Sequence, residues 1–340
     1  MKNEFRHITL DSFVCPQSKI IGRFKESWSF GRKTASYIKA NYEKIDVIYA
    51  NTWPLFAQYF LVRIAIKYNI PLVLHVQDIY PDSFVKKLPK ILGEIVYQIL
   101  LPIDKYILHK SSKIVGISPY MISHLSKSRN ISISKFQLIR NWQNDSIFNT
   151  TFDVSKNSLF TFMYLGSISP SAGLDIIIKA FSKASLQDSV LRIVGSGSKK
   201  EDCINLAKEL NCKNIIFEEA LPEDVPMLQS QADVLLLPLL KGISKTASPS
   251  KMTAYFLSGK PIIACVENDS DTADCIQQAQ CGFIIEPEDI SSLIDGFRQA
   301  CSLTHDERIQ MGENAKRFAK SSLSRSINLN RITEIIEKQQ

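Results

Sequence analysis

The residues best suited to chemistry lie in the second half of the 340-residue chain, in a segment rich in lysine and free of acids. Residues 234–266 contain no Asp or Glu, but they include four lysines: Lys241, Lys245, Lys251 and Lys260. Basic side chains without acidic neighbours create a positive potential that attracts anions. The segment therefore predicts an anion-binding site.

The run Ser248-Pro249-Ser250-Lys251 gives this prediction a geometry. Ser248 suits a helix N-cap and Pro249 a first helical residue, which puts Lys251 at the third helical position. Lysine there costs on the order of a few tenths of a kcal/mol, because that end of the helix dipole is already positive. An anion at the helix start reverses this cost, since free backbone N–H groups and the ammonium converge on it. We expect Ser248, Ser250 and Lys251, with Lys245, to bind a nucleotide diphosphate; solvated lysines in a loop are the alternative.

Two glycine-containing loops point to the same kind of ligand. Gly166-Ser167 follows the apolar run 160–165, and Gly195-Ser196-Gly197 follows the apolar run 190–194. Glycine lets the backbone approach a ligand closely. Tight strand-to-helix turns also require glycine, so the Gly-x-Gly pattern is weak evidence by itself.

The order of apolar and amphipathic segments predicts the elements that position these loops. In the first half, strands are expected at 46–50, 71–76, 113–117 and 136–139, with helices at 55–68, 85–109 and 120–127. In the second half, strands are expected at 160–165, 190–194, 214–217, 233–238, 261–266 and 282–285. Helices should alternate with these strands at 173–184, 199–210, 223–231, 249–258, 271–279 and 288–301. Such alternation with apolar strands predicts an α/β fold, in which ligands bind at the carboxyl ends of parallel strands.

The length favours two doubly wound domains, which a polar stretch at 141–157 separates. We predict a first domain at 1–150, a second at 151–320, and a helix at 321–340 that packs back toward the first. Residues 1–41 show neither a strand nor a glycine-rich loop, so the first domain is expected to be shortened at its start.

Composition indicates a cytosolic globular protein with a basic first half. The chain is 45% hydrophobic and 22% charged, no apolar run approaches the ~20 residues of a membrane span, and residues 1–11 do not resemble a secretory signal. Seven scattered cysteines favour reduced thiols. Residues 1–150 have 21 Lys and Arg against 10 Asp and Glu, whereas the rest of the chain is mildly acidic. We expect the basic half to meet a membrane surface and not nucleic acid, because no nucleic-acid module is recognisable.

Several segments together resemble a known family. They are LRIVGSGSKKEDCINLAKEL (191–210), NIIFEEALPEDVPMLQSQADVLLLPL (214–239), SPSKMTAYFLSGKPIIA (248–264), IPLVLHVQDIYPDSF (70–84), SKIVGISPYMISHL (112–125) and FQLIRNWQNDSIF (136–148). These segments are similar to the family 4 retaining glycosyltransferases of the GT-B fold, especially bacterial members that assemble capsule, O-antigen and exopolysaccharide. The resemblance covers roughly residues 45–320.

The resemblance implies a metal-independent, cofactor-free transferase with two Rossmann-like domains that face a central cleft. It would move a hexosyl or N-acetylhexosaminyl group, with retention, from a nucleotide-diphosphate sugar to a membrane-linked, polyprenyl-diphosphate glycan. The donor residues implied are Gly166, Ser167, Gly195, Gly197, Leu221, Lys245, Ser248, Ser250, Lys251 and Tyr255. The catalytic candidates are His75, Gln77, Asp78 and Lys251. The acceptor and membrane candidates are Trp53, Tyr80, Lys86, Lys87 and Lys90.

The sequence also departs from the family pattern. Thr246 and Ala254 stand where many relatives have two glutamates, the second of which usually holds the ribose. Ser167 and Ala172 stand where relatives have an arginine and a lysine, which leaves the phosphate role to Lys251. Gln77 replaces a frequent histidine, and His75 lies two residues earlier on the same strand face. Which of His75, Gln77 and Asp78 touches the transferred sugar stays open.

A second basic segment could bind the membrane. Residues 84–113 combine Lys86, Lys87 and Lys90 with a strongly apolar run between Pro89 and Pro102. A basic amphipathic helix can lie among lipid headgroups. A helix that faces the protein core and has solvated lysines fits the same pattern. The basic first half favours the peripheral membrane contact.

Three other functions fit part of the sequence. A nicotinamide oxidoreductase would use Gly195-Ser196-Gly197, but Lys200 takes the place of the third glycine. A metal-dependent transferase would use Asp269-Ser270-Asp271, which we interpret instead as solvated charge in an acidic surface loop with Glu267 and Asp274. A shortened, catalytically impaired family member would bind the nucleotide only.

Overall fold

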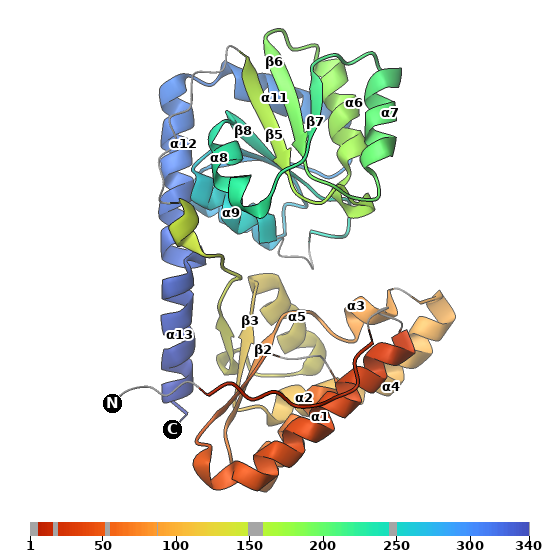
Figure 1. The fold of residues 1–340 in the computed structure, drawn as a ribbon, viewed down its shortest axis with the longest axis vertical. Helices are drawn as coiled ribbons and strands as arrows, with labels where there is room; N and C mark the ends of the chain where they lie inside the picture. Colours follow the sequence, from red (N-terminus) through yellow and green to blue (C-terminus); the bar gives the residue numbers. More distant parts are fainter. Residues whose placement is uncertain are drawn as a thin grey trace. The chain divides into compact units, whose positions relative to one another are not determined.

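This computed structural model describes residues 6–15, 20–51, 55–86, 88–148, 159–244 and 250–339. The chain forms two compact units (Figure 1): Met1–Ile139 with Asn330–Gln340, and Arg140–Leu329. The predicted boundary at residue 150 therefore falls inside the second unit. Each unit contains one parallel sheet, which confirms the predicted α/β fold class.

The first unit is built on a four-stranded sheet in the order β1-β2-β3-β4. Its strands are β1 (Ile48–Ala50), β2 (Leu72–Val76), β3 (Lys113–Gly116) and β4 (Phe136–Leu138). Its helices are α1 (Ile20–Asn41), α2 (Phe56–Lys67), α3 (Asp82–Val85), α4 (Lys90–Lys110) and α5 (Pro119–Arg129). The four predicted strands are confirmed to within two residues. The predicted helix at 85–109 is instead a short helix and a long one, because the chain breaks at Pro89 before α4 begins.

Helix α1 was not predicted from the sequence. Its 22 residues pack against α2 so closely that a Cβ at Gly31 would lie 2.7 Å from the Cα of Ala57. Trp28 of α1 makes edge-to-face contacts with Phe56 and Phe60 of α2. Helix α1 is thus stabilised by its packing against α2.

The second unit contains a six-stranded parallel sheet in the order β10-β9-β8-β5-β6-β7. The strands are β5 (Phe160–Leu165), β6 (Ser189–Val194), β7 (Ile215–Glu218), β8 (Val234–Pro238), β9 (Ile262–Cys265) and β10 (Gly282–Ile285). From β5 the chain first builds outward through β6 and β7, and then returns to the other side of β5 to build β8, β9 and β10. The switch point of this topology, where doubly wound sheets bind their ligands, therefore lies between β5 and β8.

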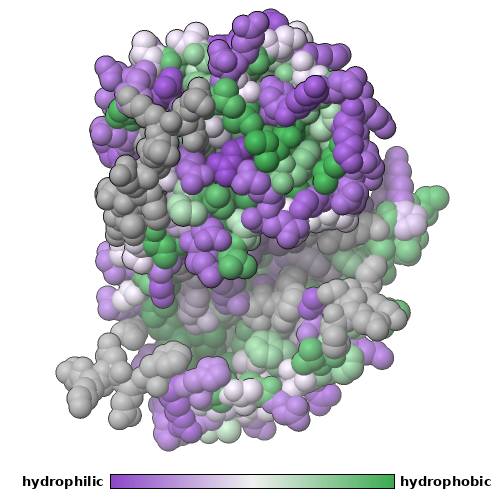
Figure 2. All heavy atoms as spheres, turned by 45° about the horizontal axis from the view of Figure 1, so that its top comes forward, coloured by the Kyte–Doolittle hydropathy of each residue, from purple (hydrophilic) through white to green (hydrophobic). Residues whose placement is uncertain are grey.

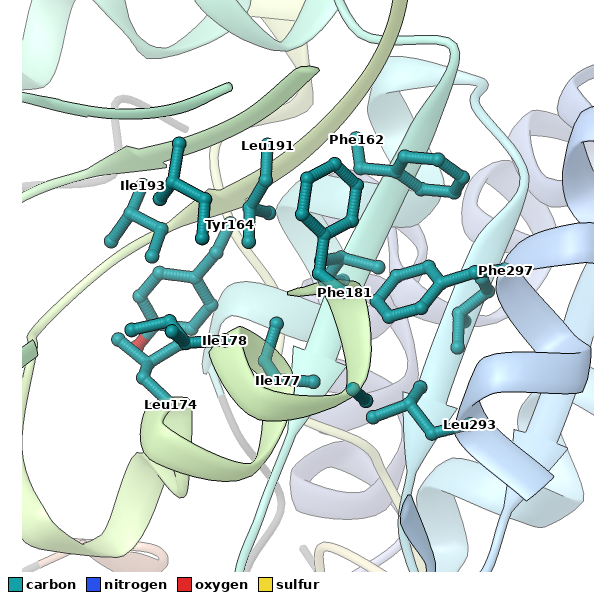
Figure 3. Close-up of a cluster of buried hydrophobic side chains, with 14 of the residues drawn as sticks. Phe162, Tyr164, Leu174, Ile177, Ile178, Phe181, Leu191, Ile193, Leu293 and Phe297 are labelled. Carbon is teal, nitrogen blue, oxygen red and sulfur yellow. The ribbon is translucent and has the colours of Figure 1, made fainter. Parts of the chain in front are cut away.

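Helices cover both faces of this sheet. They are α6 (Leu174–Ala184), α7 (Lys200–Glu209), α8 (Val225–Ser230), α9 (Ser250–Ser258), α10 (Asp271–Ala279), α11 (Ile290–Ser302) and α12 (His305–Phe318). The last helix, α13 (Arg325–Glu337), begins in the second unit and continues into the first from Asn330 onward. One buried cluster joins the sheet to α6, α7 and α11, and a second joins it to α8, α9, α10 and α12. Figure 3 shows the first cluster, in which Phe162, Phe181 and Phe297 make edge-to-face contacts. The rings of Phe162 and Tyr164, two residues apart on β5, both enter this cluster.

None of the helices in the described part of the chain is long and apolar enough to span a bilayer.

Candidate functional site

The described residues of the lysine-rich segment meet the first glycine loop at the switch point of the second unit. Lys251 lies in the first turn of α9, and its Nζ donates a hydrogen bond of 2.8 Å to the hydroxyl of Tyr164. The same ammonium lies 4.3 Å above the Tyr164 ring centroid. Tyr164 in turn donates its hydroxyl proton to the Ser167 carbonyl at 2.6 Å, so its oxygen is the acceptor for Lys251. The lysine is thereby fixed beside the loop that follows β5.

Lys251 is a half-buried cation for which the described residues offer no counter-ion. Burial lowers the pKa of its ammonium from 10.5 to about 8. No carboxylate among the described residues forms an ion pair with it. A buried charge is strongly destabilised unless an opposite charge or several hydrogen bonds accompany it. The site therefore favours an anionic ligand.

The glycine loops present backbone to this position. A Cβ at Gly166 would lie 3.4 Å from the Nζ of Lys251, and a Cβ at Gly195 would lie 2.1 Å from the Gly166 carbonyl oxygen. Gly197 is equally tight, because its Cβ would lie 2.2 Å from the Ile168 carbonyl oxygen. All three glycines have positive φ angles, between 144° and 155°. The two loops touch each other, and the Ser167 side chain is exposed.

Tyr255 supports the site from within the core. It was expected to bind the donor, but it is fully buried, and its hydroxyl donates to the Leu165 carbonyl at 3.1 Å and accepts from the Leu165 N–H at 2.9 Å. It holds the end of β5 in place and does not face a ligand. Leu221, which follows β7, is 60% exposed and is open to contact.

Some predicted donor residues cannot be placed. Lys245 and Ser248 lie outside the described residues, as does the side chain of Ser250, whose backbone begins α9.

The interpretation of Glu267 and Asp271 as solvated surface charge is wrong. Both are buried, Glu267 at 6% and Asp271 at 4% exposure. Asp271 accepts a hydrogen bond of 3.0 Å from Arg140 Nε, which leaves it committed to an ion pair. The described residues contain no group of three or more side chains placed to hold a metal ion.

Glu267 was not foreseen as a partner of the acid-free segment. Its carboxylate accepts hydrogen bonds from the Gly242 N–H and the Ser244 hydroxyl, and the Glu267 N–H donates to the same hydroxyl at 2.9 Å. This carboxylate therefore fixes the described part of the loop that follows β8. The sequence gives no signal for it, because the two segments are 23 residues apart.

In the first unit, His75 is held neutral. It is 1% exposed at the end of β2, with Tyr49 Oη 2.5 Å from Nδ1 and Gln77 Nε2 3.0 Å from Nε2. Burial lowers the pKa of His75 to about 4. Both ring nitrogens are occupied, so the exposed Gln77 amide is the part of this group that can reach a ligand.

Asp78 and Tyr80 lie next to His75 and Gln77. Asp78 is exposed and accepts a hydrogen bond of 2.8 Å from the Ser83 hydroxyl. A cavity of about 60 Å³ lies between Gln77, Asp78, Tyr80 and the buried Asp104. Tyr80 stacks on Phe84.

Arg129 positions this part of the first unit and was missed by sequence reasoning. It is fully buried and donates to Asp104 at 2.8 Å, to Asp82 at 2.5 Å and to the Tyr80 carbonyl at 3.0 Å. Burial raises the pKa of Asp104 to about 6, against the effect of the guanidinium. An arginine at the end of a helix near lysine is ordinary in sequence, and only the fold brings the two acids to it.

The remaining acceptor and membrane candidates are either exposed or outside the described residues. Lys86 and Lys90 are exposed, and Trp53 and Lys87 lie outside the described residues.

The geometry disfavours a nicotinamide site at Gly195-Ser196-Gly197. Glu218, the acid at the end of the next strand, accepts two hydrogen bonds of 2.7 Å from Arg192. A ribose would have to compete with this ion pair.

Comparison with known proteins identifies the family. Residues 149–318 match the model described as glycosyl transferases group 1, and residues 4–145 match the model of Glycosyltransferase Family 4. The chain belongs to this glycosyltransferase family, as its sequence resemblance predicted.

Individual relatives are distant. An Escherichia coli (strain K12) protein named as a colanic acid biosynthesis glycosyl transferase, WcaI, is 22% identical over 267 residues. The match covers 74% of this chain, which spans only 64% of the length of WcaI.

Solved structures share the fold. Anabaena HepE in complex with UDP has a TM-score of 0.69 at 17% identity, with 90% of this chain and 82% of HepE covered. WaaG, a glycosyltransferase involved in lipopolysaccharide biosynthesis, has a TM-score of 0.59 at 17% identity, with 86% of this chain and 85% of WaaG covered. These similarities show that the fold is GT-B.

Proposed function

We propose that this protein is a retaining glycosyltransferase that uses a nucleotide-diphosphate sugar as donor. The observation that carries the proposal is the half-buried Lys251 ammonium without a carboxylate partner in the described residues, at the switch point of the second unit. When a glycosyl donor reacts, negative charge builds up on the departing diphosphate, and a preorganised cation stabilises that charge. Lys251 supplies this cation and, together with the N-terminal amides of α9, makes a metal ion unnecessary in the proposed mechanism.

The backbone of the glycine loops would bring the donor close to Lys251. A Cβ at Gly195 or Gly197 would collide with a carbonyl group of the neighbouring loop, and a Cβ at Gly166 would contact the Lys251 side chain. Leu221, which is exposed beyond β7, would offer an apolar contact to the nucleotide. HepE was solved in complex with UDP and with UDP-glucose, and this supports uridine nucleotides as the first donors to test.

The acceptor proposed is a membrane-linked saccharide, of the polyprenyl-diphosphate type, in surface polysaccharide synthesis at the cytoplasmic face of the membrane. The names of WcaI and WaaG, which refer to colanic acid and lipopolysaccharide biosynthesis, support this class of product. In the first unit we assign Gln77 and Asp78 to contact the transferred sugar, because both are exposed beside the cavity. His75 then acts as a neutral support for the Gln77 amide.

A catalytically impaired nucleotide binder is the second candidate. Ala254 is buried and has no polar side-chain atom where many relatives carry the ribose-binding glutamate. Ribose binding then needs another group of this chain.

A thermal-unfolding screen with UDP, GDP and ADP and their sugars, with and without EDTA, tests the proposal. At ligand concentrations of about 100 times the dissociation constant, binding stabilises a protein by about 2.7 kcal/mol. We expect such stabilisation by one nucleotide diphosphate in the presence of EDTA, and transfer of the matching sugar to a lipid-linked acceptor. Stabilisation without transfer favours the impaired binder, and a strict metal requirement contradicts the proposed role of Lys251.

A further inference from the structure

The small cavity beside Gln77 and Asp78 lies at the carboxyl end of the first sheet. Its lining comes from segments that follow three strands: Gln58 after β1, residues 76–80 at the end of β2, and Leu125 after β3. Helix α4 contributes Asp104 and Leu108. All of these elements belong to the first unit (Figure 1). Parallel sheets bind their ligands at this end of the strands, so the cavity lies where a substrate group is expected.

Two polar side chains of the cavity are buried without a full set of partners. Gln58 is 8% exposed, and its amide forms no hydrogen bond with any described residue. Asp104 is 7% exposed; its Oδ2 accepts from Arg129 Nε at 2.8 Å, whereas Oδ1 has no donor among the described residues. Hydrophilic residues otherwise cover much of the outer surface, as Figure 2 shows, where water pairs their polar groups. A buried polar group without a partner is destabilising, so the cavity favours a polar ligand group.

Tyr80 adds a hydroxyl to the same cavity. Its ring stacks on Phe84, and its hydroxyl forms no hydrogen bond with a described residue. Burial, together with the charges of Asp104 and Asp78, raises the pKa of this phenol, which therefore stays protonated at neutral pH. The cavity thus presents a carboxylate oxygen that accepts, and a phenol and an amide that both donate and accept. An ammonium group only donates and would leave the phenol and amide protons unpaired, whereas an alcohol does both.

The size of the cavity selects among alcohols. A cavity of about 150 Å³ holds a benzene ring, so one of about 60 Å³ has room for roughly two or three non-hydrogen atoms. A pyranose ring is too large, but the hydroxymethyl group that projects from the ring fits. Val76, Leu108 and Leu125 provide apolar walls for its methylene. Gln77 and Asp78 also line the cavity and are exposed, so the sugar ring would stay outside against them.

We propose that this cavity is a specificity pocket for the hydroxymethyl group of a saccharide. The alcohol donates to Asp104 Oδ1 and accepts from the Gln58 amide or the Tyr80 hydroxyl. Pentoses and 6-deoxy sugars are rejected, because they leave these groups unpaired. The hydroxymethyl group belongs to the transferred sugar or to the acceptor saccharide, which offer the same chemistry. The inference deepens the proposed function and rests on it for the saccharide.

Isothermal titration with matched donors tests the transferred sugar as the source. UDP-glucose is compared with UDP-xylose, which lacks the hydroxymethyl group, and GDP-mannose with GDP-6-deoxymannose, which lacks only its oxygen. A hydrogen bond to a charged group changes affinity by a factor of roughly 10 to 150, so the wild-type protein should prefer the sugar with the alcohol by this factor. UDP and GDP without a sugar give the baseline.

NMR of the Gln58 side-chain amide tests the pocket without a nucleotide. Protein labelled with ¹⁵N-glutamine is titrated with methyl glucoside and with methyl xyloside, and the Gln58 signal is assigned by its loss in Gln58→Met. Methyl glucoside should shift this signal and methyl xyloside should not. A shift that UDP-glucose or GDP-mannose abolishes assigns the pocket to the transferred sugar. A shift that persists beside a bound nucleotide sugar assigns it to the acceptor.

Variants identify the groups that recognise the alcohol. Gln58→Met and Tyr80→Phe each remove one polar group at nearly constant size and should reduce the preference about two- to tenfold. Because both groups are unpaired without ligand, thermal unfolding of these two variants should occur at or above the wild-type temperature. Asp104→Asn keeps an oxygen for Arg129 but replaces the other acceptor with a donor, and it should lose most of the preference. Gln137→Met alters an exposed glutamine of β4 and is the matched control that should behave like the wild type.

Two results would overturn the proposal. One is a wild-type protein that binds both members of each donor pair equally, with no shift of the Gln58 signal by methyl glucoside. The other is an undiminished preference in Gln58→Met, Tyr80→Phe and Asp104→Asn, because the alcohol is then recognised elsewhere. If methyl glucoside shifts the Gln58 signal but no nucleotide diphosphate binds, the pocket stands and the proposed donor site fails. Nucleotide binding without preference or shift gives the reverse.

Discussion

Replacing Lys251 with methionine tests the donor site through two opposite effects, the first of which is on stability. Methionine keeps the length and helix preference of lysine and removes the charge. The pKa drop from 10.5 to about 8 corresponds to roughly 3 kcal/mol against the charged form in the folded protein. The variant avoids this cost but loses the hydrogen bond and the ring contact with Tyr164, together worth about 2 kcal/mol. We therefore expect the ligand-free variant to be more stable than wild type by about 1 kcal/mol at pH 7.

The pH dependence of stability provides a check on the cause. The pKa of Lys251 is lower in the folded protein than in the unfolded chain, so the unfolded chain binds more protons between pH 8 and pH 10.5. The stability contribution of this residue therefore rises with pH in that window, and its cost is fully present below pH 8. The variant lacks this rise. Its stability advantage over the wild type should shrink and reverse as the pH approaches 10.5.

Ligand binding should change in the opposite direction. A charge-assisted hydrogen bond to phosphate is worth about 1.5–3 kcal/mol, so Lys251→Met should weaken binding of the nucleotide diphosphate roughly 10- to 150-fold. Isothermal titration with UDP and other nucleotide diphosphates measures this loss. Thermal unfolding in the same buffers should show a higher melting temperature without ligand and a smaller increase with it.

Lys260→Met is the matched control. Burial also lowers the pKa of Lys260, but this lysine precedes β9 at the other end of α9, where Asp233 is nearby. This variant should change stability and leave nucleotide affinity unchanged. If the Lys251→Met variant binds a nucleotide diphosphate as tightly as the wild type, the ammonium does not hold the diphosphate and the proposed site is wrong.

Three other changes test the surrounding structure. Gly195→Ala should lower the free energy of unfolding of the second unit by more than about 2 kcal/mol, because its Cβ would collide with the Gly166 carbonyl. Gly242 also has a positive φ but has open space around it, so Gly242→Ala should lower the free energy of unfolding by about 1 kcal/mol. Chemical denaturation compares the two variants. Arg129→Met leaves the buried Asp104 and the half-buried Asp82 without their cation and should lower the free energy of unfolding by about 3–5 kcal/mol, measured in the same way. His75 should titrate near pH 4 when followed by NMR. Because its pKa is lower in the folded protein than in the unfolded chain, the stability of the wild type should fall as the pH drops from 6.5 to 4. The His75→Gln variant should lack this part of the loss.

The second unit was the more predictable one because its strands are mostly apolar. Strands β5 and β10 begin and end at the predicted residues, and the other four differ by one residue at either end. Buried parallel strands have no solvent-facing positions, so their apolar runs stand out against the amphipathic helices. Helix α1 was missed because it contains two glycines and its exposed and buried apolar residues are mixed. Its packing face becomes recognisable only beside α2.

The site was predictable where the chemistry is local in sequence. Lys251 was predicted from its position at the start of a helix, and the glycine loops were predicted from their positions after strands. The structure brings their described parts together. Tyr164, Glu267 and Arg129 gave no such signal. Each acts on a residue 20 or more positions away in the chain, so its role depends on the fold and not on neighbouring sequence.

Tyr164 explains how an unfavourable charge can persist at the switch point. Its ring is packed in the core between β5 and α6, with Leu174 and Ile178 beside it (Figure 3), so the position of its hydroxyl is set by the core. That hydroxyl donates its proton to the Ser167 carbonyl, so it can only accept a hydrogen bond from Lys251. A flexible partner would let the lysine swing into water and recover its hydration. A rigid acceptor together with the close-packed glycine loops keeps the ammonium in place, and the strain that remains is relieved by an arriving anion.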